Sequence, residues 1–257
     1  MAEIAATAVV DARAELDDDV RVGPYAIIGP HVRIGAATTV GAHAVIDGYT
    51  EIGRRCRIFP HAAIGLEPQD LKYQGGVSWL RIGDRTVVRE FATLNPATKE
   101  GESTLVGPDC LLMAYSHVAH NCRLEDHVIL ANAVNLAGHV TVESHAVIGG
   151  VTPVHQFVRV GAHAMIGGGS RVPKDVAPYT LTAGNPLRTC GLNQRGLSRR
   201  GFPEASIDAL RRAYRIFFRE KLGVTEAVAR IRAEVPATPE IEHLLAFVLS
   251  SERGITR

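Results

Sequence analysis

Histidine side chains gather in one short stretch of this sequence, and their spacing is typical of a chemical site. Residues 113–122 read MAYSHVAHNC and place His117 three residues before His120. Two further histidines follow, His139 in the segment LAGHV and His155 in the segment VHQF. A neutral imidazole accepts a proton near physiological pH and so suits general base catalysis, while histidines that converge also bind zinc. Both uses depend on how the surrounding chain places these side chains.

The histidines are embedded in a repeat of six residues that runs from Ile4 to Val172. A large aliphatic residue stands at almost every sixth position, and among these 29 positions only Asp70, Gly76 and Glu100 are not aliphatic. A helix repeats every 3.6 residues and a strand every two, so neither explains a sustained period of six. The repeat therefore decides the fold.

The residues around each repeat position predict a triangular coil. The residue two places earlier is usually small, and glycine commonly follows, as at Gly23, Gly29 and Gly35. A short strand that points one large and one small side chain inward, and then turns sharply, fits this pattern. Three such strands form a coil of 18 residues, and coils stacked roughly 4.8 Å apart build a prism. We therefore predict an all-β domain, a parallel β-helix.

The coil length predicts which histidines lie together. Division by 18 leaves remainders of 12, 13 and 11 for His120, His139 and His155, so all three are expected near one corner of successive coils. A base at this corner, with the backbone N–H of Gly138 as an oxyanion donor, is one interpretation. A zinc site and plain turn histidines are the alternatives. A second column, spaced by 18, is interpreted as repeat register without function: His127, His145 and His163.

The repeat is interrupted twice, and both interruptions are predicted to be loops. Residues 66–81 contain QDLKY, with Asp70 and Lys72, and the repeat returns at Ile82, eighteen residues after Ile64. We expect one coil's worth of chain to leave the prism here. Residues 95–105 form the second break. Function concentrates in such loops, although surface decoration or an oligomer contact is the alternative for both.

Composition excludes several classes of protein. The net charge of +1 and the lack of a basic arm argue against nucleic-acid binding. The sequence contains no run of 18 apolar residues, so stable membrane insertion is not expected. The N-terminus lacks the pattern of a signal peptide. Cys56, Cys110 and Cys122 fall on the small inward position of the repeat and only Cys190 lies outside it, so a reducing, cytoplasmic compartment is predicted.

The pattern changes after Val172 from the six-residue repeat to a helical period. We predict a β-helix domain over residues 1–186 and a helical domain over residues 187–257. One helix is expected from Pro203 to about Glu220, and two more are expected to start at Thr225 and Thr238. Arginines concentrated at this end are either a solvated helix face or a surface for an acidic partner.

Several motifs, taken in order, resemble those of the acyl-carrier-protein–UDP-N-acetylglucosamine O-acyltransferases, a family of hexapeptide-repeat enzymes. They are QDLKY, HVAHNC, LAGHV, VHQF, GGGS and GLSRRGF, and they span essentially the whole chain. The resemblance implies a left-handed β-helix and a homotrimer whose sites lie between subunits. It also implies the first step of lipid A biosynthesis. There, a 3-hydroxyacyl chain passes from acyl carrier protein to the 3-hydroxyl of UDP-N-acetylglucosamine, and no metal or cofactor is needed.

The same resemblance implies roles for individual residues. His120 corresponds to the general base, the N–H of Gly138 to the oxyanion donor, and Asn121 to the neighbour of the base. Gly168 corresponds to the position that limits acyl length, and the paired Arg199 and Arg200 suit a diphosphate. The implied substrate-binding residues are Asp70, Lys72, His117, His139, His155, Gln156, Gly168, Asn193, Arg199 and Arg200.

Three departures from the family pattern bear on the acceptor. Asn121 replaces an aspartate beside the base, residues 95–98 read NPAT in place of His-Arg-Gly-Thr, and Arg195 stands where glutamate is common. A weaker base would suit a better nucleophile, such as a 3-amino sugar. Further alternatives are an N-acyltransferase acting on a 2-amino sugar of the same pathway, a zinc hydratase, and a non-catalytic prism.

Overall fold

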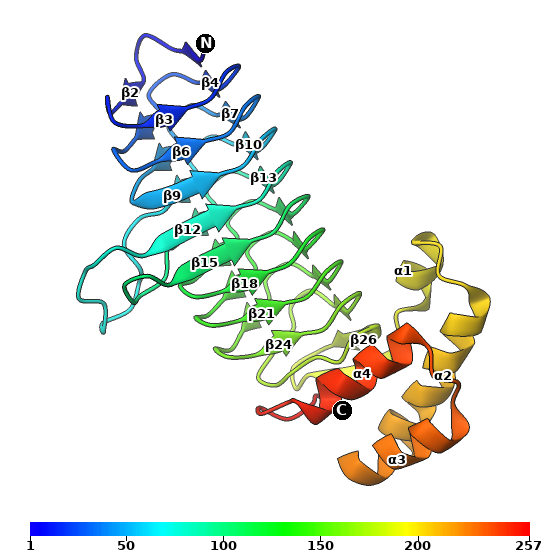
Figure 1. The fold of residues 1–257 in the computed structure, drawn as a ribbon. Helices are drawn as coiled ribbons and strands as arrows, with labels where there is room; N and C mark the ends of the chain where they lie inside the picture. The colour runs from blue at the N-terminus through cyan, green and yellow to red at the C-terminus, as the bar shows by residue number, and fades with distance from the viewer.

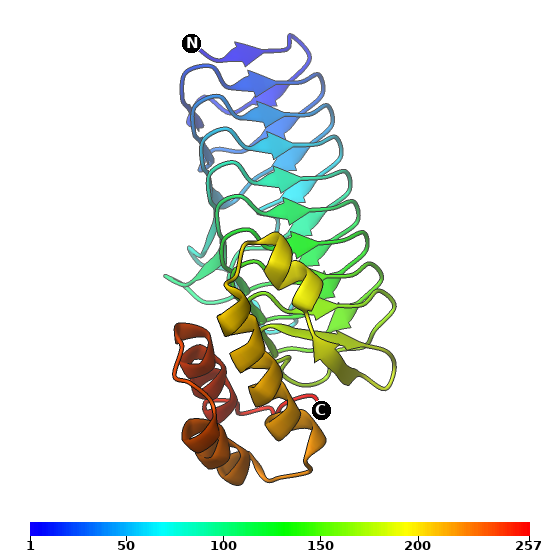
Figure 2. The same ribbon diagram turned by 90° about the vertical axis from the view of Figure 1, so that its right-hand side faces the viewer.

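The chain forms a three-sided prism of stacked coils with a group of helices at its C-terminal end (Figure 1). The structure is a computed structural model that describes all residues from Met1 to Arg257. The three faces of the prism are three parallel sheets, and successive strands visit the faces in turn. The N-terminus lies at the far end of the prism from the helices, as Figure 2 shows. The predicted parallel β-helix is confirmed.

Each sheet takes every third strand of the prism. One sheet contains β1 (Glu3–Ile4), β4 (Arg21–Val22), β7 (Thr39–Val40), β10 (Arg57–Ile58), β13 (Val87–Val88), β16 (Leu111–Leu112), β19 (Ile129–Leu130), β22 (Val147–Ile148) and β25 (Met165–Ile166). A second contains β2 (Val9–Val10), β5 (Ile27–Ile28), β8 (Val45–Ile46), β11 (Ala63–Ile64), β14 (Thr93–Leu94), β17 (His117–Val118), β20 (Asn135–Leu136) and β23 (Pro153–Val154). The third contains β3 (Glu15–Leu16), β6 (Arg33–Ile34), β9 (Tyr49–Ile52), β12 (Trp79–Ile82), β15 (Ser103–Val106), β18 (Arg123–Leu124), β21 (Thr141–Val142) and β24 (Arg159–Val160).

The six-residue repeat produces this architecture because most strands are only two residues long. In β5 the first residue, Ile27, faces solvent and the second, Ile28, is buried, while the small Ala26 before the strand is also buried. Inward polar residues are satisfied: the Thr38 hydroxyl donates to the Gly53 carbonyl over 2.8 Å and accepts from the Cys56 N–H over 2.9 Å. Stacking aligns these inward residues into one hydrophobic core along the prism.

The turns carry ladders of stacked side chains. His43 has a left-handed backbone with φ of 59°, which costs a residue with a Cβ atom roughly 1–2 kcal/mol. Its N–H donates to the carbonyl of Pro24 in the preceding coil over 3.1 Å, and its ring stacks between Tyr25 and His61 at centroid distances of 5.1 and 5.0 Å. These contacts offset the strain. The turn histidines of this column therefore have a structural role.

The two breaks are loops, but the first is shorter than predicted. In a regular coil Ile34 pairs with Ile52, which lies three repeats further along the chain. Ile52 in turn pairs with Ile82, which lies five repeats further along. The loop therefore adds two repeats and not the three of a full coil. The expectation of one coil's worth of chain was wrong, because the eighteen residues from Ile64 to Ile82 include one repeat that a regular coil also has, and only two repeat positions, Asp70 and Gly76, are lost.

The second loop adds one repeat and lies against the first. Ile82 pairs with Val106, which lies four repeats further along the chain, one more than in a regular coil. The Gly101 N–H donates to the Val77 carbonyl over 2.8 Å, and the Asn95 amide donates to the Leu66 carbonyl over 3.0 Å. Both loops project together from one corner of the prism (Figure 1).

A hairpin joins the prism to the helices. Its strands are β26 (Thr180–Ala183) and β27 (Arg188–Leu192), and β26 continues the sheet that ends at β25. The division of the chain at residue 186 falls in the turn of this hairpin and stays a prediction. The helices, which pack around a second hydrophobic cluster, are α1 (Gln194–Arg199), α2 (Glu204–Arg219), α3 (Val224–Glu234) and α4 (Pro239–Leu249).

The helix starts were predicted with mixed success. Pro203 is the N-cap of α2, and the Thr238 hydroxyl caps α4 by accepting from the Ile241 N–H, so both starts are confirmed. The predicted third helix is also present, and it begins at Val224 after Gly223, one residue before the Thr225 expected as its start. No helix combines the length and the apolar character needed to cross a membrane.

Candidate functional site

The largest concentration of predicted site residues lies in one cavity of about 950 Å³. The cavity is bounded on one side by the two loops and on the other by a corner of three successive coils. The predicted residues that line it are Asp70, Lys72, His117, His120, Gly138, His139 and Gln156. The sequence argument thus brought together residues that are up to 86 positions apart, since 156 − 70 = 86.

Parallel stacking of β17, β20 and β23 places these groups. His117 in β17 pairs with Thr93 in the coil before it and Asn135 in the coil after it. The turns that follow the three strands lie directly over one another, because the His139 N–H donates to the His120 carbonyl and the Phe157 N–H to the Gly138 carbonyl. The His120 and His139 rings meet edge to face, with centroids 5.3 Å apart.

Hydrogen bonds to Asn121 define the tautomer of His120. The Thr98 N–H donates to Asn121 Oδ1, and Asn121 Nδ2 donates to a carboxylate oxygen of Glu102 over 2.6 Å. Because these partners fix which amide atom is oxygen, the 2.9 Å contact between Asn121 Oδ1 and His120 Nδ1 requires the proton on Nδ1. The lone pair therefore lies on His120 Nε2, the nitrogen that faces Asp70 Oδ2 at 3.7 Å.

Gly138 lies against the face of this imidazole. A Cβ atom built on Gly138 would fall 2.5 Å from His120 Nε2 and 3.1 Å from Nδ1, so only glycine fits beside the ring. The Gly138 N–H donates to no group of the chain, while the neighbouring N–H groups of Ala137 and His139 donate to the carbonyls of Val154 and His120 in the adjacent coils. A free N–H next to a basic nitrogen suits stabilisation of a developing oxyanion.

The two other cavity histidines are held neutral. Burial, and then the neighbouring His120, lower the pKa of His117, whose Nδ1 lies 2.7 Å from the Thr93 hydroxyl. Burial and His120 also lower the pKa of His139, whose ring stacks on Phe157. Neutral imidazoles bind sugar hydroxyl and carbonyl groups without bringing a second positive charge to the base.

His155 and Gly168 lie outside the cavity. The coil position of His155 led us to expect it beside His120 and His139, but its side chain is exposed and its Nδ1 lies 3.1 Å from the carbonyl of Gln156. The expected trio of histidines therefore does not converge within one chain, which removes the basis for a zinc site at this corner. Gly168 lies at a different corner, against Gly150.

The predicted nucleotide-side residues line a second hollow, of about 860 Å³, on another face of the prism. Arg199, Arg200 and Asn193 border it together with Met165 and Val147 of the sheet that contains β25. The Asn193 side chain caps α1 by accepting from the Gly196 N–H and also donates to the His163 carbonyl. Within one chain, this hollow and the His120 cavity are therefore separate and share no lining residue.

The sequence reasoning missed the contribution of the second loop. Thr98 and Lys99 line the cavity, and Thr98 and Glu102 hold Asn121. The buried Asn95 fastens the base of the first loop. The NPAT segment, noted as a departure from the family pattern, therefore orders the loop that borders His120. The break in the repeat was the available signal, but its residues were not assigned a role.

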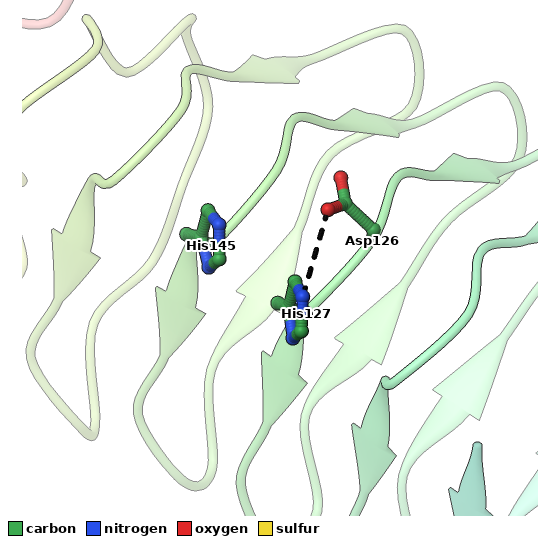
Figure 3. A group of neighbouring side chains, drawn as sticks. All are labelled: Asp126, His127 and His145. Atoms are coloured by element: carbon green, nitrogen blue, oxygen red, sulfur yellow. Dashed lines mark ion pairs between the residues drawn. The ribbon is translucent and has the colours of Figure 1, made fainter. Parts of the chain in front are cut away.

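The second histidine column includes a group of potential metal ligands (Figure 3). Asp126, His127 and His145 bring one ligand atom each within 4.8 Å. The two imidazoles, however, stack with centroids 4.5 Å apart and planes 5° apart, so their in-plane lone pairs run parallel and do not converge. Arg200 also lies 2.7 Å from His145 Nδ1. The geometry supports the interpretation of this column as stacked turn side chains.

The hexapeptide turns, the three-sided β-helix and the helical end define a hexapeptide-repeat transferase. A family model described as bacterial transferase hexapeptide matches residues 13–48, and one described as domain 2 of UDP N-acetylglucosamine O-acyltransferase matches residues 175–256. The chain belongs to the acyl-(acyl-carrier-protein)–UDP-N-acetylglucosamine O-acyltransferase family. Proteins of that name from Thermodesulfovibrio yellowstonii and Thiobacillus denitrificans are 46% and 48% identical over 258 residues, with both chains fully covered.

Solved structures of the family share the whole fold. LpxA from Acinetobacter baumannii superposes with a TM-score of 0.95 at 40% identity, covering 99% of both chains. LpxA from Bacteroides fragilis gives a TM-score of 0.96 at 39% identity, covering 98% of this chain and 99% of that one. These matches confirm the resemblance and the left-handed parallel β-helix with C-terminal helices. They identify the chain as an enzyme and do not favour the alternative functions.

Proposed function

We propose that this enzyme transfers a 3-hydroxyacyl chain from acyl carrier protein to the 3-hydroxyl of UDP-N-acetylglucosamine, the first step of lipid A biosynthesis. The observation that supports this most strongly is that the His120 ring, with its free Nε2, lies close to Gly138, whose N–H is free, in the same cavity. Asp70 and Lys72 from the first loop supply polar groups at its rim.

The proposed reaction needs only groups of the protein and its substrates. His120 Nε2 takes the proton of the sugar 3-hydroxyl as the oxygen attacks the thioester carbonyl carbon. The negative charge that forms on the carbonyl oxygen is stabilised by the Gly138 N–H. Collapse of this intermediate breaks the C–S bond, and the imidazolium returns its proton to the leaving thiolate. The products are the 3-O-acyl sugar nucleotide and acyl carrier protein with a free thiol.

We also propose that the enzyme acts in the cytoplasm as a homotrimer. The His120 cavity lies at the sheet that contains β17, whereas Arg199 and Arg200 lie beside the sheet that contains β25. A threefold axis would bring one of these faces against the other on the neighbouring subunit and so complete a site. His155 and Gly168, which lie outside the cavity of a single chain, would reach the site across the same interface.

Acyl carrier protein is proposed to dock near the arginines that have no carboxylate partner. Arg211 pairs with Glu204 and Asp208, and Arg215 pairs with Glu220, so these two add little positive charge. Arg199, which forms no ion pair, borders the second hollow, and Arg200 contacts a histidine. Positive charge at this end would steer an acidic carrier protein.

Purified enzyme is expected to convert UDP-N-acetylglucosamine to a product heavier by one 3-hydroxyacyl group when it receives 3-hydroxyacyl carrier proteins of several chain lengths. Mass spectrometry of the sugar nucleotide measures this product, and alkaline hydrolysis separates an ester from an amide. Acylation of only a 3-amino or 2-amino acceptor, or no transfer from any chain length, would contradict the proposal.

Mixed trimers test whether sites are shared between subunits. Arg199→Ala/Arg200→Ala and His120→Ala proteins are each expected to be inactive, since each lacks one half of every site. Refolding them together in equal amounts is expected to restore about a quarter of wild-type activity, because random mixing gives each interface roughly a one-in-four chance of receiving both intact halves. The control mixes each variant with itself. Failure to recover activity in trimers shown to contain both chains would place each complete site within one subunit.

A further inference from the structure

Glu102 stands directly behind the catalytic corner. Its carboxylate accepts from Asn121 Nδ2 over 2.6 Å, and Asn121 Oδ1 contacts His120 Nδ1 at 2.9 Å. The series of hydrogen bonds from His120 through Asn121 to Glu102 therefore ends in a negative charge, although the residue next to the base is a neutral amide. None of the motifs that identify the family includes Glu102.

The backbone of Glu102 is fixed although its side chain is exposed. Its N–H donates to the Lys99 carbonyl over 3.1 Å, and its carbonyl accepts from the Trp79 N–H over 2.9 Å. It also immediately precedes β15, a strand of the prism. The second loop thus delivers this carboxylate to a defined position from a rigid support.

We infer that Glu102 is a positioning residue for the acyl transfer proposed above, supplying through Asn121 the countercharge that an aspartate beside the base would otherwise supply. The inference rests on the proposed role of His120. When His120 takes the sugar proton, its Nδ1–H bond to Asn121 strengthens, and the amide is polarised toward the Glu102 carboxylate. Asn121 transfers no proton, so the carboxylate acts by its field and by holding the amide orientation.

Other charged groups also face His120 and remain unchanged in the test. Asp70 lies 3.7 Å from Nε2, and the first loop carries Lys72 to the rim of the cavity. His117 and His139 flank the ring, and Lys99 borders the cavity from the second loop. The effect of Glu102 must therefore be measured as a change against this constant background.

Glu102→Gln removes the charge and keeps the hydrogen bond, because the new amide oxygen accepts from Asn121 Nδ2. The carboxylate favours the protonated imidazole, so its loss moves the acid-side midpoint of kcat/KM to lower pH. We expect a shift of about 0.5 to 1 pH unit, the size of a partly screened interaction across one amide, and a fall in kcat of roughly three- to tenfold. Glu100→Gln, in the same loop but without contact to Asn121, is expected to change neither quantity.

The double variant Glu102→Gln/Asn121→Asp exchanges donor and acceptor across the same hydrogen bond. It moves the carboxylate next to His120, so the midpoint and kcat are expected to return to wild-type values or above. The inference is overturned if Glu102→Gln matches Glu100→Gln, or if the double variant is no better than Glu102→Gln. An inactive wild-type enzyme would instead refute the proposed function.

Discussion

Replacing His120 with alanine is expected to lower kcat/KM for acyl transfer by about 10²- to 10⁴-fold, the usual contribution of a positioned general base. His120 is the group with a free ring nitrogen beside the free N–H of Gly138, and no other cavity histidine has this arrangement. His117 and His139 stay in place in the variant, but the first is bonded to Thr93 and the second stacks on Phe157. Neither ring is positioned to replace the missing base.

The effect is measured as initial rates over a range of both substrate concentrations, so that kcat and KM are separated. A fall in kcat with little change in KM would match a group that acts in the transition state. His127→Ala is the matched control, because His127 is an exposed member of the stacked column and lies outside the cavity. Activity that survives His120→Ala within tenfold of wild type would remove His120 as the base.

The prism could be predicted from sequence because its period is unique to the fold. Each two-residue strand contributes only one large inward residue, so the pattern of Ile28, Ile34 and Val40 records the geometry directly. The length of the first loop was also recorded in the sequence, since the two lost repeat positions, Asp70 and Gly76, equal the two repeats that the loop adds, and the expected length was a miscount. The start of α3 was predicted one residue late, because Gly223, and not a side-chain cap, precedes the helix.

The corner that carries the site could also be predicted, but the direction of each side chain could not. Coil position placed His120 and His139 correctly, yet His155 turns outward because a residue in a turn is not bound to the inward–outward alternation of a strand. Thr98 and Glu102 reach the corner from an inserted loop, whose path depends on tertiary contacts. The face of the neighbouring subunit that is proposed to complete the site could not be predicted either, since periodicity within one chain does not describe contacts between subunits.

Gly138→Ala is expected to lower activity by about 10²-fold or more without unfolding the prism, since misplacing a reacting group by about 1 Å has an effect of this size. The added Cβ atom would lie 2.5 Å from His120 Nε2, well inside van der Waals contact. The ring has little room to retreat, because Asn121 holds its Nδ1 and His139 packs against it edge to face. Displacement of the ring would break the first of these contacts and move Nε2 away from the sugar hydroxyl.

The variant separates two functions of this glycine. Alanine retains the N–H that is proposed to bind the oxyanion, so loss of activity in Gly138→Ala reports the position of the base and not the loss of a donor. Gly223→Ala is the control for a glycine-to-alanine change, because a Cβ atom there meets nothing within 4 Å and its backbone φ of −62° suits alanine. Thermal unfolding of both variants should match the wild type within a few degrees. Full activity in Gly138→Ala would mean that the imidazole can move aside at no cost, and the tautomer and position assigned to His120 would then fail as the basis of catalysis.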